Sequence, residues 1–141
     1  MYKSAGLFMV MSLLFACSAK NITPQRGGVS MSRVTGTISY LQRMALPPSS
    51  LITVQLVDVS RADSPAIVIG EQFFEAGGQQ VPFVFEILYD PAAIKANHSY
   101  VLKARIEIHG KLRFINDQHY AVVTRDAPSQ VDMVLKAVGG P

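Results

Sequence analysis

The only cysteine of this 141-residue chain, Cys17, is the side chain with the widest choice of chemistry. A single thiol can act as a nucleophile, a metal ligand, a buried core residue or the attachment point of a covalent group. One cysteine cannot form an intrachain disulfide, and it cannot supply the paired cysteines of a Cys/His zinc site. The residues around Cys17 decide among the remaining roles.

An apolar run leads directly to this cysteine. Lys3 is the only charged residue before it, and the thirteen residues from Ala5 to Cys17 are apolar or small. A positive residue, a short apolar stretch and small residues before a cleavage site are the parts of a secretory signal peptide. A helix that spans a bilayer needs about 20 apolar residues, so this run is too short to remain as an anchor. We therefore predict that residues 1–16 are a cleaved signal peptide.

The end of the run, Leu14-Phe15-Ala16-Cys17, resembles the bacterial lipobox, with Leu three residues before the cysteine and a small residue immediately before it. This resemblance implies diacylglycerol transfer to the thiol, cleavage before Cys17 and acylation of the new amino terminus. Two or three acyl chains hold a protein stably on a membrane, whereas one chain binds marginally. Asp after the cysteine commonly retains such proteins in the inner membrane, so Ser18 favours the outer membrane. The alternative is an ordinary signal peptide in which Cys17 has no role.

The other reactive side chains show no catalytic or metal-binding spacing. The histidines, His98, His109 and His119, lie at predicted strand ends or turns, and we expect them to be exposed. Glu71 and Glu75 share one face of a predicted strand, which is typical of a solvated surface. No nucleophile elbow, glycine-rich phosphate loop or Walker pattern occurs. The sequence therefore predicts a non-enzymatic protein without a metal or a cofactor.

The composition favours a folded domain that does not bind nucleic acid. Apolar residues make up 49% of the chain, and the formal net charge of +3 comes from Lys and Arg residues spread along its whole length. A nucleic-acid-binding surface needs clustered cations that follow the phosphate backbone. We therefore expect no nucleic-acid partner.

The elements that follow the cysteine are a tether and a series of strands. Residues 17–32 contain Pro24, the Gly27-Gly28 pair and small polar residues without apolar periodicity, which predicts a flexible lipidated tether. From residue 33 to residue 138, short alternating runs predict strands over 34–41, 51–59, 67–75, 81–89, 100–108, 112–115, 119–124 and 131–138. Asp90-Pro91 predicts one helical turn, and His109-Gly110 predicts a hairpin reversal.

Seven or eight short strands with almost no helix predict an all-β domain, which we interpret as a small antiparallel β-sandwich. A small β-barrel is the alternative architecture. The aromatic residues in these strands are expected to form the core; they are Phe73, Phe74, Phe83 and Phe85.

Several stretches of the predicted domain resemble the YbaY/YscW-type lipoprotein family. They are A-L-P-P-S-S-L-I-T-V-Q-L-V-D-V-S-R-A-D-S-P-A, P-F-V-F-E-I, D-P-A-A-I and A-R-I-E-I-H-G-K-L-R-F-I-N-D. The resemblance covers residues 33–138, and its most specific part runs from Ala45 to Pro65. It implies a compact β-sandwich carried on a lipidated tether.

The resemblance also implies a division of function. One branch of the family, the pilotins, escorts secretin subunits of type III secretion to the outer membrane and promotes their assembly, and the other branch consists of envelope lipoproteins without an established role. We therefore expect a lipid-anchored protein on the periplasmic face of the outer membrane that acts by protein–protein contact, with a secretin or another envelope protein as its partner. The alternative is a housekeeping lipoprotein that binds a small ligand or glycan in a pocket containing Phe73, Phe83 or Tyr89.

Overall fold

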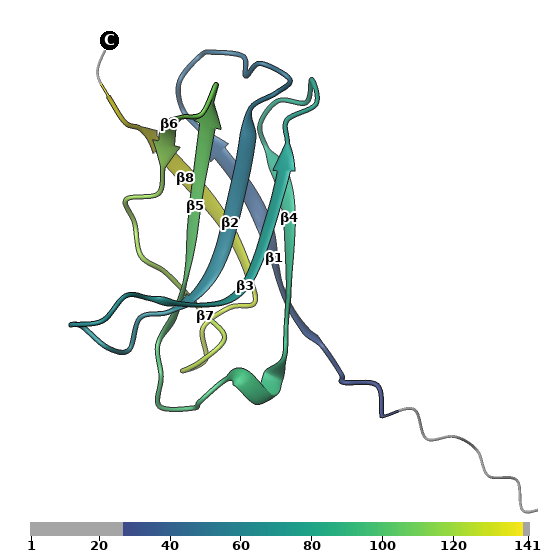
Figure 1. The fold of residues 1–141 in the computed structure, drawn as a ribbon, viewed down its shortest axis with the longest axis vertical. Coiled ribbons are helices and arrows are strands. Elements are labelled where there is room, and N and C mark those ends of the chain that lie inside the picture. The colour runs from purple at the N-terminus through teal and green to yellow at the C-terminus, as the bar shows by residue number, and fades with distance from the viewer. Residues whose placement is uncertain (1–26, 140–141) are drawn as a thin grey trace, which may run out of the picture.

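The computed structural model describes residues 27–139, which form eight β-strands and one short 3₁₀ turn (Figure 1). The elements are β1 (Ser32–Tyr40), β2 (Leu51–Asp58), β3 (Ile67–Glu75), β4 (Phe83–Tyr89), η1 (Pro91–Ala93), β5 (Tyr100–Ile108), β6 (Lys111–Ile115), β7 (Tyr120–Val122) and β8 (Gln130–Ala137). The predicted all-β fold is confirmed, and every predicted strand is present. The predicted signal peptide, Cys17 and the tether up to residue 26 lie outside the described residues.

The strands form one sheet in the order β3-β2-β5-β6-β8-β1-β4, and β7 pairs with β5. One layer contains β2, β3 and β5, and the other contains β1, β4 and β8 (Figure 1). A short pairing of β6 with β8, at Phe114–Ala137 and Ile115–Lys136, joins the two layers along one edge. The structure therefore combines the predicted sandwich with its barrel alternative, because two facing layers belong to one nearly closed sheet.

One pairing departs from the predicted antiparallel arrangement. β1 and β8 run parallel, with Thr35 opposite Gln130, whereas every other pairing in the described chain is antiparallel. These are the first and last strands of the domain, so all the other strands lie between them in the sequence. Gly36 permits their close approach, because a Cβ atom there would lie only 1.7 Å from the carbonyl oxygen of Val131.

The end strands of the sheet, β3 and β4, meet without a backbone ladder in the described chain. Instead, the side-chain Oε1 of Gln72 in β3 accepts a hydrogen bond of 2.8 Å from the backbone N–H of Glu86 in β4. Gly70 lets the two strands approach, since a Cβ atom on it would lie 2.8 Å from the carbonyl oxygen of Leu88. Side chains and a close backbone approach thus close the sheet at this seam.

The inward side chains of both layers form one continuous hydrophobic core. In β4 the pattern is strictly alternating, so Phe83, Phe85 and Ile87 are buried while the residues between them are exposed. Each large apolar side chain buried in this way contributes about 1.5–3 kcal/mol. Tyr40 stacks on Phe114 with ring centroids 4.4 Å apart, which extends the core to the end of β1.

The predicted turns form as their residue types require. Asp90 is the N-cap of η1, and its carboxylate accepts a hydrogen bond of 2.8 Å from the N–H of Ala92. His109 and Gly110 both have positive φ, at 50° and 73°, as a two-residue type I′ hairpin turn between β5 and β6 requires.

Candidate functional site

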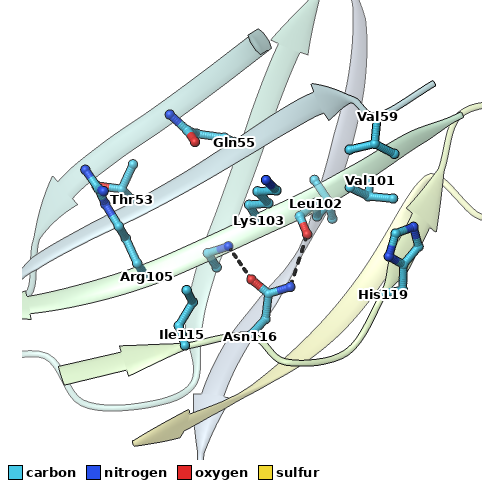
Figure 2. Close-up of a pocket in the computed structure, with 11 residues that line it drawn as sticks. Thr53, Gln55, Val59, Val101, Leu102, Lys103, Arg105, Ile115, Asn116 and His119 are labelled. Atoms are coloured by element: carbon cyan, nitrogen blue, oxygen red, sulfur yellow. Dashed lines mark hydrogen bonds between the residues drawn. The ribbon is translucent and has the colours of Figure 1, made fainter. Parts of the chain in front are cut away.

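A groove of about 470 Å³ lies on the outer surface of the β2–β5 layer, which faces away from the hydrophobic core (Figure 2). Its walls come from three neighbouring parts of the fold: β2 and the residue after it, β5, and the end of β6 with the segment that follows. The lining residues are Thr53, Gln55, Val59, Val101, Leu102, Lys103, Ala104, Arg105, Ile115, Asn116 and His119.

The period-two alternation of β5 places its charged side chains on this outer surface. Ala104 and Ile106 point inward and are buried, whereas Lys103 and Arg105 are exposed. Gln55 lies opposite Lys103 on the adjacent strand β2, and Thr53 lies opposite Arg105. The same alternation that builds the core therefore supplies the polar floor of the groove.

Two cross-strand rows run across this floor. The register of four neighbouring strands gives a first row of Phe73, Thr53, Arg105 and Ile115. A second row, two residues further along each strand, contains Glu71, Gln55 and Lys103. Phe73 is 68% exposed and Ile115 is 37% exposed, whereas Thr53 between them is only 7% exposed. The first row thus has an exposed apolar residue at each end, with the buried Thr53 between them.

The side chain of Asn116 closes one wall of the groove. β6 and β7 both pair with β5, but neither covers its middle. There, Asn116 Oδ1 accepts a hydrogen bond of 2.8 Å from the N–H of Ala104, and its Nδ2 donates to the carbonyl of Leu102 at 3.3 Å (Figure 2). Its own backbone N–H donates to the carbonyl of Ala104 at 3.3 Å. One asparagine therefore replaces a missing segment of strand.

The groove is positive. Its charged lining residues are Lys103 and Arg105, and none of its lining residues carries a carboxylate. Lys103 and Arg105 form no ion pair with any residue between 27 and 139. Two carboxylates lie beside the groove on the same outer face: Glu71 accepts a hydrogen bond from the side chain of Gln55, and Glu107 is two residues from Arg105 on β5.

A second polar cluster lies at the C-terminal end of β2. His98 Nδ1 is 2.6 Å from Asp58 Oδ2, and the Ser60 hydroxyl donates to Asp58 Oδ1 at 2.5 Å. Burial raises the pKa of the Asp58 carboxyl, but the hydrogen bonds from His98 and Ser60, together with the charge of His98, outweigh burial and lower the pKa to about 2. His98 is half-buried, so the prediction of an exposed turn histidine is wrong for this residue.

This cluster does not have the geometry of a catalytic triad. A triad needs the histidine between the carboxylate and the hydroxyl, so that it can accept the hydroxyl proton. Here, Asp58 contacts both other residues, and the Ser60 oxygen also accepts a hydrogen bond of 2.8 Å from the N–H of Ser99. The cluster therefore connects the end of β2 with the segment before β5.

The other candidate residues from the sequence do not lie together in one site of the described chain. His109 and His119 are exposed, as predicted, and Glu71 and Glu75 are exposed on β3. Between residues 27 and 139, no three His, Cys, Asp or Glu residues lie close enough to hold a metal ion. The same range contains no helix long and apolar enough to cross a bilayer.

The aromatic residues do not form the predicted ligand pocket. Phe83 and Tyr89 are buried in the core, and the small exposed part of Tyr89 lines only an open depression near η1. Phe74 is half-buried, whereas the exposed Phe73 shows that the core prediction is wrong for this one aromatic residue. No observation therefore favours a small-ligand or glycan site on an aromatic-lined face.

The groove was not predicted from the sequence, although part of its signal was visible there. The alternation of Lys103 and Arg105 with apolar residues indicated that both cations lie on an outer face. The sequence did not indicate which strands lie beside them. Thr53 and Asn116 became recognisable as site residues only through the pairing of β2 and β6 with β5.

Comparison with known proteins gives consistent results. Residues 29–135 match the family described as type III secretion system lipoprotein chaperone (YscW). The lipoprotein YbaY of Escherichia coli K12 is 33% identical over 114 residues, which are 81% of this chain and 60% of the relative, so the chain spans about three fifths of that protein. The solved structure of an alternative pilotin from the type II secretion system of Vibrio cholerae superposes with a TM-score of 0.75 at 49% identity, covering 78% of this chain and 99% of the pilotin.

Proposed function

The chain belongs to the YscW family of secretion lipoprotein chaperones, and we propose that it acts as a pilotin, a lipid-anchored protein that binds a secretin subunit and escorts it to the outer membrane. The proposed activity is non-enzymatic and consists of protein–protein contact combined with membrane attachment. The partner is a secretin.

The observation that carries this proposal is the similarity to the Vibrio cholerae pilotin, which is 49% identical and almost completely covered. The family description refers to type III secretion, whereas this solved relative belongs to a type II system. Because the identity to the type II pilotin is high, a type II secretin is the first partner to test, and a type III secretin is the second.

A lipid at Cys17 would supply the membrane attachment in this proposal. Residues Ser18 to Met31 lie between that cysteine and the start of β1. Fully extended, these fourteen residues would reach roughly 50 Å at about 3.3–3.6 Å per residue. Such a tether would let a membrane-held domain contact secretin subunits before they assemble.

Deletion of the gene tests the proposed function. We expect heat-resistant secretin multimers to decrease in the outer-membrane fraction and secretin monomers to accumulate elsewhere in the envelope. Expression of the intact chain should restore the multimers, whereas expression of a Cys17→Ser chain at the same level should not. Normal multimer levels after deletion, for both secretin types encoded by the cell, would show that the proposal is wrong.

A further inference from the structure

We propose that the groove on the β2–β5 layer is the partner-binding surface, and that it binds a protein segment that carries carboxylates and apolar side chains on one and the same face. This inference names the binding surface for the proposed pilotin function and therefore rests on it.

The positive side chains of the groove favour an acidic partner segment. Lys103 and Arg105 stand two residues apart on one face of β5, which places their side chains about 7 Å from each other along the strand. Both are exposed and have no ion-pair partner within the part of the chain that the structure describes. Carboxylates on a partner segment would satisfy these cations with charge-assisted hydrogen bonds.

The exposed apolar residues at the two ends of the first row favour apolar side chains on the partner segment. Phe73 and Ile115 are separated by three strand spacings, or roughly 14 Å. Both are exposed on the same surface as Arg105, although apolar side chains of this size gain free energy from burial. A segment that crosses the strands would cover both residues and place its acidic side chains over the cations between them.

The floor of the groove is rigid, which reduces the entropic cost of binding. β2 forms hydrogen-bonded ladders on both sides, with β3 and with β5. Asn116 fixes the remaining wall through its bonds to Leu102 and Ala104. The cations therefore project from a preformed surface.

The first experiment measures binding of a defined probe to the purified lipidated chain in a non-ionic detergent. The probe is a short fluorescent peptide with the repeat Leu-Ser-Asp-Ser, whose Leu and Asp side chains share one face of an extended chain, compared with the same peptide carrying Asn in place of Asp. We expect the Asp peptide to bind and the double substitution Lys103→Glu/Arg105→Glu to weaken binding by at least about tenfold, because two charge-assisted contacts become repulsive. Added salt should weaken binding to the wild-type chain.

The matched control is Lys111→Glu/Arg113→Glu. These two exposed residues have the same types and the same spacing on the adjacent strand β6, but neither lines the groove. The control changes the net charge by the same amount but leaves the groove unchanged, so it should retain wild-type affinity. Equal losses in both variants, or equal binding of the Asn peptide, would overturn the inference. Binding of vesicles containing phosphatidylglycerol through Lys103 and Arg105, without binding of the Asp peptide, would also overturn it.

The second experiment uses cells and separates the two proposals. With the intact chain, a photoreactive amino acid at Gln55 should crosslink to the secretin, whereas one at Val84, which is exposed on β4, should not. If the peptide binds in the groove but deletion leaves the secretin multimers unchanged, the pilotin function is wrong and the groove assignment stands. If the wild-type chain supports secretin assembly and Lys103→Glu/Arg105→Glu supports it equally, the groove assignment is wrong and the function stands.

Discussion

The side-chain oxygen of Gln72 in β3 accepts a hydrogen bond of 2.8 Å from the backbone N–H of Glu86 in β4 and thereby bridges the two end strands of the sheet. We expect Gln72→Ala to lower the free energy of unfolding by about 0.5–1.5 kcal/mol, the usual contribution of one hydrogen bond. Urea unfolding measures this difference. Gln79→Ala, in the exposed turn that follows β3, is the control and should remain within about 0.5 kcal/mol of the wild type. Equal stability of the two variants would show that the bridge contributes nothing.

Gly36 lies at a close approach of β1 to β8. Gly36→Ala would place Cβ 1.7 Å from the carbonyl oxygen of Val131, and this backbone atom cannot rotate away. We expect either no folded protein or a loss of more than about 3 kcal/mol, as for other severe steric clashes. Circular dichroism during thermal unfolding measures the effect. Gly28→Ala should leave the melting temperature unchanged, since nothing lies within 4 Å of a Cβ at that position.

The Asp58–His98 pair predicts a specific acid dependence. The pKa of Asp58 lies near 2 in the folded chain and at its ordinary value of 3.8 when unfolded. Because the folded pKa is the lower one, the stabilisation is complete above the unfolded value and is lost as the pH falls from about 5 towards 2. We expect Asp58→Asn to lower stability by roughly 1–3 kcal/mol at neutral pH and to flatten the decline in this range.

Chemical unfolding at a series of pH values tests this prediction. Asp63→Asn, in the exposed loop after β2, is the control and should keep the wild-type profile. A wild-type acid profile for Asp58→Asn would contradict the assigned role of the pair.

Asn116 replaces a strand segment beside β5, so its removal should expose that part of the ladder. Asn116→Ala removes the side-chain bonds to Ala104 and Leu102 and should cost roughly 2 kcal/mol. Asn116→Asp should cost at least as much, because a carboxylate cannot donate to the carbonyl of Leu102. Hydrogen exchange at the Ala104 amide provides the local measurement and should accelerate in Asn116→Ala, which removes the acceptor of that amide. Unchanged exchange would contradict the role of this side chain.

Lipid attachment at Cys17 remains a prediction, and it can be tested directly. Cys17→Ser removes the thiol that the acyl group requires, so we expect no incorporation of labelled palmitate and no lipid mass on the N-terminal peptide. Ser18→Ala leaves the thiol in place and should be labelled like the wild type. Labelling of Cys17→Ser equal to that of the wild type would show that Cys17 is not the lipidated residue.

Local patterns in the sequence were sufficient to predict most of the secondary structure. Alternation identified β4 and β5 and assigned an inward and an outward face to each, because successive side chains in a strand point to opposite sides. Asp90 and Pro91 predicted the helical turn, and His109-Gly110 predicted the hairpin, because these positions depend on the conformational preferences of one or two residues. The same kind of local pattern led to the prediction that Cys17 is lipidated.

Tertiary structure decided the relationships between strands that are distant in the sequence. It made β1 and β8 parallel neighbours, joined Gln72 to Glu86 and paired the half-buried His98 with Asp58. It also aligned Phe73, which was predicted to be a core residue, with Arg105 across β2, so that both lie on one outer surface. A period of two determines which side of a strand each residue occupies, but neighbouring strands are chosen by the packing of the whole core, which no local stretch of sequence contains.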